Sequence, residues 1–475
     1  MSNNQKFFIN GEWIDPQPGS STFEVLHPGN EEPIATIAMG SEADVAMAVA
    51  AAKDAFETWQ FVSVEERIGL LERIKDLYLA KYDAFTETMS REMGTCLSFS
   101  REIQTPCGDG HIQATIDALK AHEFERPSPR GGSILIDEPI GVCGLITPWN
   151  WPVNQVIVKV APALAAGCTM VLKPSEYSPL SAIMLAEIID EAGCPPGVFN
   201  LINGDGIDVG APLTRHPDVD MVSFTGSTRA GIAISKAAAD TVKRVALELG
   251  GKSPNLVFAD ADLEQVAEIA LDACFNNNGQ SCDAGSRLLV ERSVYQEVTD
   301  RVAEAVRNTR VDDPMKDGDH IGPVVNKKQF DNIQRLIQAA IDEGTTLLVG
   351  GTGLPQGFNQ GYYVRPTVFS DVTNDMIIAR EEVFGPVIAI MPFDTEEEAI
   401  KIANETPYGL SAFIQSTDKA RIDRVSRKLR AGSINVNGAA ADYDVPFGGY
   451  KQSGNSKENG PFALEEYLDT KAVNQ

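Results

Sequence analysis

From Pro139 onward the chain alternates short apolar runs with stretches of helical length, and this alternation limits the possible fold more than any other feature. The runs are GVCGLI, TMVLK, VFNLI, DMVSF and RVALEL, with helical stretches near 152–166, 179–192, 206–215 and 228–239 between them. Short strands without polar alternation are typical of a parallel sheet that is covered on both faces. We therefore predict a doubly wound nucleotide-binding domain whose ligand lies at the carboxyl ends of the strands.

A second alternation of the same kind begins beyond Gly250. The runs NLVFAD, RLLVE, TLLVGG, VIAIMPF, SAFIQS and GSINVN are separated by helical stretches near 262–278, 293–309, 326–342, 395–404 and 418–430. Because 475 residues are too many for one ordinary core, this set predicts a second α/β domain. Residues 120–138 and the last dozen residues fit neither alternation.

The residues before these two sets predict short strands followed by helices. Strand and turn patterns occupy the first 40 residues, and Ser41 with Asp44 is typical of a helix N-terminus. Apolar residues then recur at helical spacing through Val45, Val49 and Ala52. A second helical stretch is expected from about 64 to 93.

Charge and composition exclude several classes of partner. The 67 acidic and 40 basic residues give a net charge of −27, which repels nucleic acid and anionic membrane surfaces, although a salty habitat or plain solubility would explain the same charge. Seven cysteines without a CxxC pair and five histidines without HxxxH spacing predict neither disulfides nor a metal site. The polar start is unlike a signal peptide, and the longest apolar stretch, interrupted by Lys159 and Pro162, is short for a membrane span, so we expect a cytoplasmic protein.

The segment FTGSTRAG, at 224–231, is a candidate phosphate site. Gly226 allows a tight turn after a strand, and Ser227 and Thr228 can cap the following helix, whose free N–H groups favour an anion. Capped helices after strands are also common without any ligand, and the fingerprint GxGxxG is absent from the first strand–helix turn. Arg229 could add positive charge or simply face solvent.

A second candidate is the cysteine of NNNGQSCDAGSR. Cys282 lies among small and polar residues, whereas a structural cysteine, such as Cys274, normally occupies an apolar position. The residues therefore suggest a nucleophile, with an ordinary loop cysteine as the alternative. Glu248, before Gly250 and Gly251, is either a functional carboxylate at a strand end or a surface residue.

Seven motifs, in this order, resemble the NAD(P)-dependent aldehyde dehydrogenase superfamily over essentially the whole chain. They are TPWNWP (147–152), KPSE (173–176), FTGSTRAG, LELGGKSPN (247–255), GQSCDAGSR, EEVFGPV (381–387) and PFGGYKQSG (446–454). The resemblance implies a dinucleotide-binding domain at 1–118 and 139–250, and a catalytic α/β domain at 251–450. It also implies a β-strand oligomerisation arm at 119–138 and 451–475, and therefore a homodimer or a homotetramer.

The resemblance implies that an aldehyde is oxidised to a carboxylic acid through a thiohemiacetal and a thioester on Cys282. The amide of Asn150 and the backbone N–H of Cys282 would stabilise the oxyanion, and Glu248 would activate the hydrolytic water. One alternative is a CoA-acylating enzyme, which would have no need of a base for water at Glu248. Another, from a different class, is a non-catalytic dinucleotide-binding or structural protein on the same fold.

By the same resemblance, Lys173 and Glu176 match positions that bind the adenosine ribose. A carboxylate there favours NAD over NADP because it repels a 2′-phosphate, although Ser175 and Arg229 leave NADP possible. The other matched cofactor or active-site positions are Ser227 at the pyrophosphate, Glu382 and Phe384 at the nicotinamide and its ribose, and Trp149, Lys159, Gly206, Gly210, Gly226, Gly231 and Leu249.

Four residues are expected to contact the aldehyde, namely Trp151, Asp283, Tyr443 and Phe447. Trp151 and Tyr443 would line an aromatic tunnel. If the Asp283 carboxylate faces the substrate, it would repel acidic semialdehydes and tolerate neutral or cationic aldehydes; the alternative is that it bonds its own loop. One departure from common family usage is Lys457 before Glu458, where an arginine is frequent; the charge is kept but the bidentate fork is lost.

Overall fold

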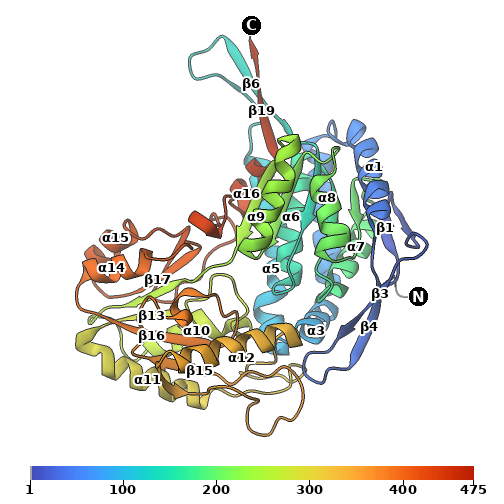
Figure 1. The fold of residues 1–475 in the computed structure, drawn as a ribbon. Coiled ribbons are helices and arrows are strands. Elements are labelled where there is room, and N and C mark those ends of the chain that lie inside the picture. The colour runs from blue at the N-terminus through green and yellow to red at the C-terminus, as the bar shows by residue number, and fades with distance from the viewer. Residues whose placement is uncertain (1–2, 475) are drawn as a thin grey trace.

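The computed structural model describes residues 3–474 and contains two seven-stranded sheets side by side, with a narrow three-stranded sheet projecting from the body (Figure 1). In the first sheet the order is β11-β10-β7-β8-β9-β1-β2. Its parallel strands are β7 (Val142–Ile146), β8 (Thr169–Lys173), β9 (Phe199–Leu201), β10 (Met221–Gly226) and β11 (Arg244–Leu249). All five strands predicted between 141 and 249 are present. The antiparallel β1 (Phe7–Ile9) and β2 (Glu12–Ile14) complete the edge.

The strand order of this sheet determines where a ligand can bind. From β7 the chain moves outward through β8 and β9, and then returns to the other side of β7 to form β10 and β11. The loops after β7 and β10 therefore diverge, and such a switch point leaves a crevice at the carboxyl edge of the sheet. The loops concerned carry residues 147–151 and 226–228.

Helices cover both faces of the first sheet. They include α1 (Glu42–Trp59), α5 (Pro106–Ala121), α6 (Pro152–Ala166), α7 (Leu180–Glu191), η2 (Gly206–Gly210), α8 (Ala211–Arg215) and α9 (Thr228–Ala238). Two separate apolar clusters pack against the two faces, so both faces of the strands are buried, as the unalternated runs predict. The expected N-terminus of α1 is present as a full capping box between Ser41 and Asp44.

The single helical stretch expected at about 64–93 is two helices, α2 (Val64–Ala80) and α3 (Tyr82–Met93). The break is at Lys81, whose backbone angles (φ −108°, ψ 18°) leave the helical region. Neither glycine nor proline marks this position, so the sequence carries no local signal for it.

The second sheet has the order β14-β15-β16-β13-β12-β17-β18. Its strands are β12 (Pro254–Val257), β13 (Arg287–Glu291), β14 (Thr346–Val349), β15 (Thr367–Ser370), β16 (Val387–Phe393), β17 (Ser411–Gln415) and β18 (Ser433–Val436). Only β15 was not expected from the sequence. The main helices around the second sheet are α10 (Val266–Phe275), α11 (Tyr295–Asn308), α12 (Lys327–Asp342), α14 (Glu396–Asn404) and α15 (Lys419–Ser426).

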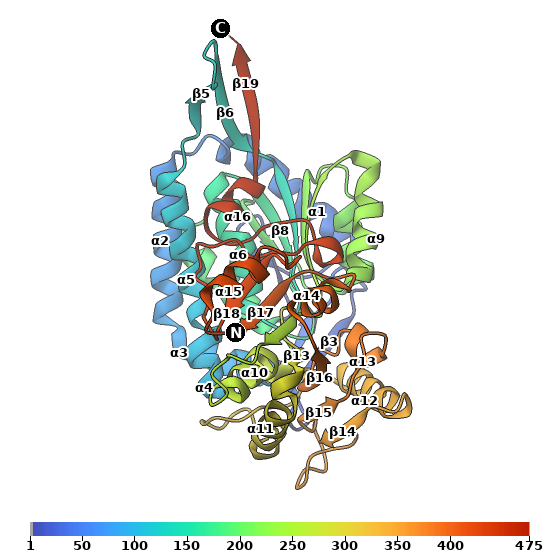
Figure 2. The same ribbon diagram turned by 90° about the vertical axis from the view of Figure 1, so that its left-hand side faces the viewer.

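The two segments that fit neither alternation form the projecting sheet (Figure 2). It consists of β5 (Glu125–Pro127), β6 (Ser133–Pro139) and β19 (Leu468–Asn474), with β19 paired antiparallel to β6 over its whole length. Six of the seven β19 residues are exposed. Over residues 3–474, no helix is both long enough and apolar enough to cross a membrane.

Candidate active site

A cleft of about 530 Å³ lies where the loops after β7 and β10 meet the second sheet. The first sheet contributes residues from 148–150, 225–229 and 249–250, and the second α/β unit contributes residues from 282, 326–332 and 382–384. Eight of the expected site residues line it, namely Trp149, Asn150, Gly226, Ser227, Leu249, Cys282, Glu382 and Phe384. The position agrees with the crevice that the strand order predicts.

A tight reversal carries Cys282 into this cleft. After α10, Asn277, Asn278 and Gly279 all have left-handed backbone angles (φ 57°, 60° and 74°). Asparagine and glycine adopt this region most readily, which explains the sequence NNNG. A Cβ on Gly279 would lie 2.2 Å from the carbonyl carbon of Gly385, so the close approach to the second sheet also requires glycine.

The same loop fixes the side chain of Asn150. Asn277 Nδ2 donates to the carbonyls of Asn150 (2.8 Å) and Gln280 (3.2 Å), and Asn150 Nδ2 donates to the Gln280 carbonyl (2.9 Å). A primary amide has two N–H groups, so one donor of Asn150 remains for a ligand in the cleft. Gln104 Nε2 holds the Asn277 oxygen at 2.7 Å and thereby sets the orientation of its amide.

Further contacts fasten the loop to both halves of the chain. Asn278 Nδ2 donates to the carbonyls of Gly94 and Pro323, both at 2.9 Å, and Gln280 Oε1 accepts from the N–H of Val325 at 2.9 Å. Asn277, Asn278 and Gln280 were not among the residues expected from the sequence. The run of asparagines before the glycine is the signal that could have found them.

The environment of the Cys282 thiol is acidic. The residue is partly exposed at the cleft, yet burial raises the pKa of its thiol well above the usual value. The carboxylates of Asp283, Glu382 and Glu248 raise this pKa further. Burial likewise raises the pKa of the Asp283 carboxyl. At neutral pH the thiol is therefore protonated in the protein alone.

Glu248 lies at the end of β11, behind the residues that line the cleft. Its Oε1 accepts a hydrogen bond from Ser456 Oγ (2.8 Å), whereas Oε2 is buried and has no hydrogen-bond partner in the described part of the chain. Burial raises the pKa of this carboxyl well above the usual value, and Glu458 adds to the increase. Lys159, one of the expected site residues, forms a buried ion pair with Glu458 instead of lining the cleft.

The N-terminus of α9 faces the cleft and suits a diphosphate. Ser227 Oγ caps the helix by accepting from the N–H of Ala230 (3.3 Å), and the other first-turn N–H groups lack partners within the helix. The hydroxyl of Thr225 also lines the cleft and is buried without a hydrogen-bond partner within residues 3–474. A Cβ on Gly231 would lie 2.7 Å from Leu249, so glycine allows α9 to pack closely on β11.

Lys173 and Glu176 lie together at the end of β8, with their side chains 3.6 Å apart. Lys173 Nζ also donates to the carbonyl of Gly204 (2.7 Å), and burial lowers the pKa of its ammonium. A Cβ on Gly210 would approach the Lys173 side chain to 3.8 Å, whereas one on Gly206 would meet open space. These four residues do not line the 530 Å³ cleft itself.

Glu382 and Phe384 line the same cleft as the N-terminus of α9. Glu382 Oε1 accepts from the N–H of Gly251 (3.2 Å), and burial raises the pKa of this carboxyl to about 7. A Cβ on Gly250 would lie 2.2 Å from Glu382 Oε2, so a side chain there would push the Glu382 carboxylate out of its present position. Phe384 packs edge-on against Trp149, with ring centroids 5.3 Å apart.

The four expected substrate residues fall into separate places. Trp151 Nε1 donates to Ser281 Oγ (3.0 Å), directly beside Cys282 and Asp283. Tyr443 packs instead on α5, with its ring 4.8 Å from that of His111. Phe447 pairs through its backbone with Glu458. None of Trp151, Asp283, Tyr443 and Phe447 lines the 530 Å³ cleft.

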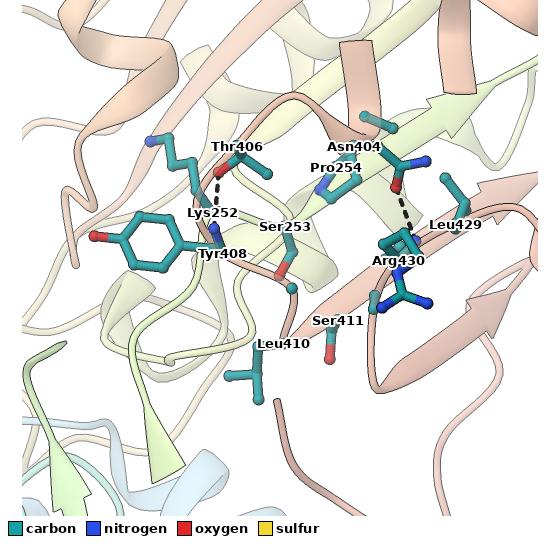
Figure 3. Close-up of a pocket in the computed structure, with 14 residues that line it drawn as sticks. Lys252, Ser253, Pro254, Asn404, Thr406, Tyr408, Leu410, Ser411, Leu429 and Arg430 are labelled. Atoms are coloured by element: carbon teal, nitrogen blue, oxygen red, sulfur yellow. Dashed lines mark hydrogen bonds between the residues drawn. The ribbon is translucent and has the colours of Figure 1, made fainter. Parts of the chain in front are cut away.

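A second, much smaller cavity lies between β12, α14 and β17 (Figure 3). Its volume is about 10 Å³, enough for one water molecule at most. It is lined by residues such as Lys252, Ser253 and Tyr408, and none of the expected catalytic residues is among them. Among residues 3–474, no cluster of three or more His, Cys, Asp or Glu could hold a metal ion.

Comparisons of the sequence and of the structure with known proteins all match aldehyde dehydrogenases. The family model described as the aldehyde dehydrogenase family matches residues 13–473. The chain is 48% identical over 474 residues to 3-succinoylsemialdehyde-pyridine dehydrogenase of a Pseudomonas species, covering 100% of this chain and 99% of that protein. It matches the crystal structure of an aldehyde dehydrogenase from Bartonella henselae with a TM-score of 0.98, 50% identity and complete coverage of both chains. A mutant of aldehyde dehydrogenase C from Pseudomonas syringae, in complex with NAD+ and octanal, matches at TM-score 0.98 and 46% identity over 99% of this chain and 97% of that chain.

Proposed function

Because this chain belongs to the aldehyde dehydrogenase family, we propose that Cys282, Asn150 and Glu248 carry out its reaction. The protein is an enzyme that oxidises an aldehyde to a carboxylic acid with NAD+. The observation that carries the assignment of residues is the position of the thiol and the amide of Asn150 in one cleft, next to a helix N-terminus.

In the first step the Cys282 thiol, which is protonated in the protein alone, releases its proton to solvent at the cleft. The resulting thiolate attacks the aldehyde carbon, and the carbonyl oxygen becomes an oxyanion. The free N–H of Asn150, together with the backbone N–H of Cys282, stabilises this oxygen. Removal of one such donor typically raises the barrier by about 2.7–4 kcal/mol. NAD+ supplies the acceptor for the hydride that leaves the thiohemiacetal carbon.

A thioester on Cys282 remains, and water must then displace the thiolate. Glu248 takes a proton from that water, the new C–O bond forms, and the C–S bond breaks. Its raised pKa makes the carboxylate a stronger base than an ordinary glutamate once it is ionised. A base for water is not needed when CoA accepts the acyl group, so Glu248 favours hydrolysis.

The cleft and the neighbouring end of β8 together fit a dinucleotide. The N-terminus of α9 would hold the pyrophosphate, Glu382 the nicotinamide ribose, and the pair Lys173 and Glu176 the adenosine ribose. The carboxylate of Glu176 hydrogen-bonds free ribose hydroxyls and repels a 2′-phosphate, which favours NAD+ over NADP+. In support, structural relatives from Pseudomonas syringae, Staphylococcus aureus and Bacillus cereus were solved with NAD+.

For the substrate we propose neutral aldehydes. Asp283 follows the nucleophile directly, and its carboxylate would repel an acidic semialdehyde. The relative from Pseudomonas syringae was solved with octanal, a neutral aliphatic aldehyde. The tail of the substrate would pass Trp151 and then Tyr443.

The exposed edge strand β19 of the projecting sheet supports an oligomer. An unpaired strand edge of this kind is normally covered by a second chain, so we propose that residues 119–138 and 451–475 pair with a partner subunit. All seven cysteines are free, which supports a reducing compartment such as the cytoplasm.

One experiment tests the proposal as a whole. NADH formation is measured with octanal, propanal and succinic semialdehyde, each with NAD+ and with NADP+, with and without CoA. We expect activity with the neutral aldehydes and NAD+, unaffected by CoA. A preference for succinic semialdehyde would contradict the role of Asp283, and stimulation by CoA would contradict that of Glu248.

A further inference from the structure

Ser456 is held firmly against the end of β11 by the backbone around it. The N–H groups of Asn455 and Ser456 both donate to the carbonyl of Leu247 (3.1 and 3.4 Å), and Asn455 Oδ1 accepts from the N–H of Leu247 at 2.9 Å. Gly454 forms a bridge with Glu248 in the same place. Ser456 is 3% exposed, so its hydroxyl has a fixed position relative to the Glu248 side chain.

The two carboxyl oxygens of Glu248 have different surroundings. Oε1 accepts from Ser456 Oγ at 2.8 Å and packs over Gly448, where a Cβ would come within 2.6 Å of it. Oε2 is equally buried but has no hydrogen-bond partner anywhere in the described residues. A buried oxygen without a partner is costly unless something else, such as a water molecule, meets it.

The charged and titratable groups facing this carboxyl come from three elements. Glu458 and Lys457 follow Ser456, Lys159 comes from α6, and Cys282 comes from the catalytic loop. Lys159 is already paired with Glu458, and Lys457 Nζ donates to the carbonyls of Gly448 and Gly449. The Ser456 hydroxyl is the group that hydrogen-bonds the Glu248 carboxyl directly.

We propose that Ser456 is a positioning residue for thioester hydrolysis. Its hydroxyl holds Oε1 of Glu248, so that Oε2 is the oxygen left to take the proton from the attacking water. The inference rests on the proposed role of Glu248 as general base. Neither the formation of the thiohemiacetal nor the loss of hydride depends on this hydrogen bond.

The test is Ser456→Ala, studied by rapid-mixing kinetics with octanal and NAD+. Formation of the first equivalent of NADH reports the steps before the thioester, and the following steady-state rate reports hydrolysis. We expect the burst to keep its rate, while the steady-state rate falls about tenfold, as for the loss of one hydrogen bond to a charged group. The Ser456 hydroxyl lowers the pKa of Glu248, so its removal should also shift the acidic limb of the steady-state rate to higher pH.

Two controls separate positioning from structure. Ser456→Ala in a Glu248→Gln background should cause no further loss of hydrolysis, because the two residues act as one unit. Ser90→Ala removes another buried hydroxyl with a 2.8 Å bond, to Ser100 Oγ, far from Glu248 in the chain, and should leave both phases unchanged. If Ser456→Ala does not fold, Ser456→Cys, which nearly preserves the volume and is a weak donor, takes its place.

The inference is overturned if burst and steady-state rates fall together, if the loss persists in the Glu248→Gln background, or if Ser456→Ala has no effect. Absence of any burst in the unaltered enzyme, with no acyl group on Cys282, would instead contradict the proposed function itself.

Discussion

The thiol end of the cleft, around Asn150 and Cys282, is held by side chains from both α/β units, whereas the dinucleotide end, around Ser227 in the cleft and Lys173 beside it, is formed by strand ends of the first sheet. At the thiol end, the side chain of Asn277 hydrogen-bonds Gln104, Asn150 and Gln280. At the dinucleotide end, the N-terminus of α9 offers free N–H groups to an anion, and closely packed glycines let the helix approach the sheet. The comparison suggests that the two ends can be altered separately, with chemistry lost at one and cofactor affinity at the other.

The strongest test of this separation is Cys282→Ala. We expect NADH formation from octanal to fall by about 10⁴-fold or more, because no other group near the aldehyde replaces the nucleophile. The Kd of NAD+, measured by calorimetry, should change less than about threefold, since the thiol contributes no charge to the pyrophosphate or adenosine sites. Turnover close to that of the unaltered enzyme would show that Cys282 is not the nucleophile.

Asn150→Ala should have the next largest effect. Loss of one oxyanion donor is expected to lower the burst rate by about 10²–10³-fold, while NAD+ affinity is kept. The measurement is the rate of the NADH burst at saturating octanal. A loss confined to the KM for octanal would show that Asn150 binds the ground state and not the oxyanion.

The acidic surroundings of the thiol make a prediction about pH. Because the pKa of Cys282 is raised, the thiolate fraction at pH 7 is small, and alkylation by iodoacetamide should be about tenfold or more slower than that of a free thiol. The rate should still be rising at the pH where a free thiol has levelled off. Mass spectrometry of the peptide that carries Cys282 gives the rate at this residue alone. Alkylation faster than the free thiol at pH 7 would contradict the account.

Glu176→Gln tests the proposed adenosine position beside the cleft and should have the smallest effect. Loss of the carboxylate should tighten NADP+ binding by up to about tenfold and weaken NAD+ binding a few-fold, with the burst rate at saturating NAD+ unchanged. Calorimetric titration with both dinucleotides provides the comparison. A slower burst at saturation would show that the two ends are coupled.

The two ends also differ in how far the sequence predicts them. The strands and the capped helix of the dinucleotide end are local patterns, so β7 to β11 and the cap at Ser227 were predictable from apolar runs and turn residues. The break at Lys81 and the strand β15 carry no comparable local signal. At the thiol end the decisive contacts join distant parts of the chain, such as Gln104 with Asn277 and Ser456 with Glu248. The motifs predict roles for Cys282, Glu248 and Asn150, but only the structure shows which contacts hold them.

The proposed acyl group on Cys282 can be detected by chemical quenching of the reaction. The Glu248→Gln variant is mixed with octanal and NAD+, and the reaction is stopped with acid within the burst. The masses of its proteolytic peptides are then measured by mass spectrometry. We expect an octanoyl group on the peptide that carries Cys282, in an amount that matches the NADH formed. NADH formed without an acyl group on any cysteine, or with the acyl group on a different cysteine, would contradict it.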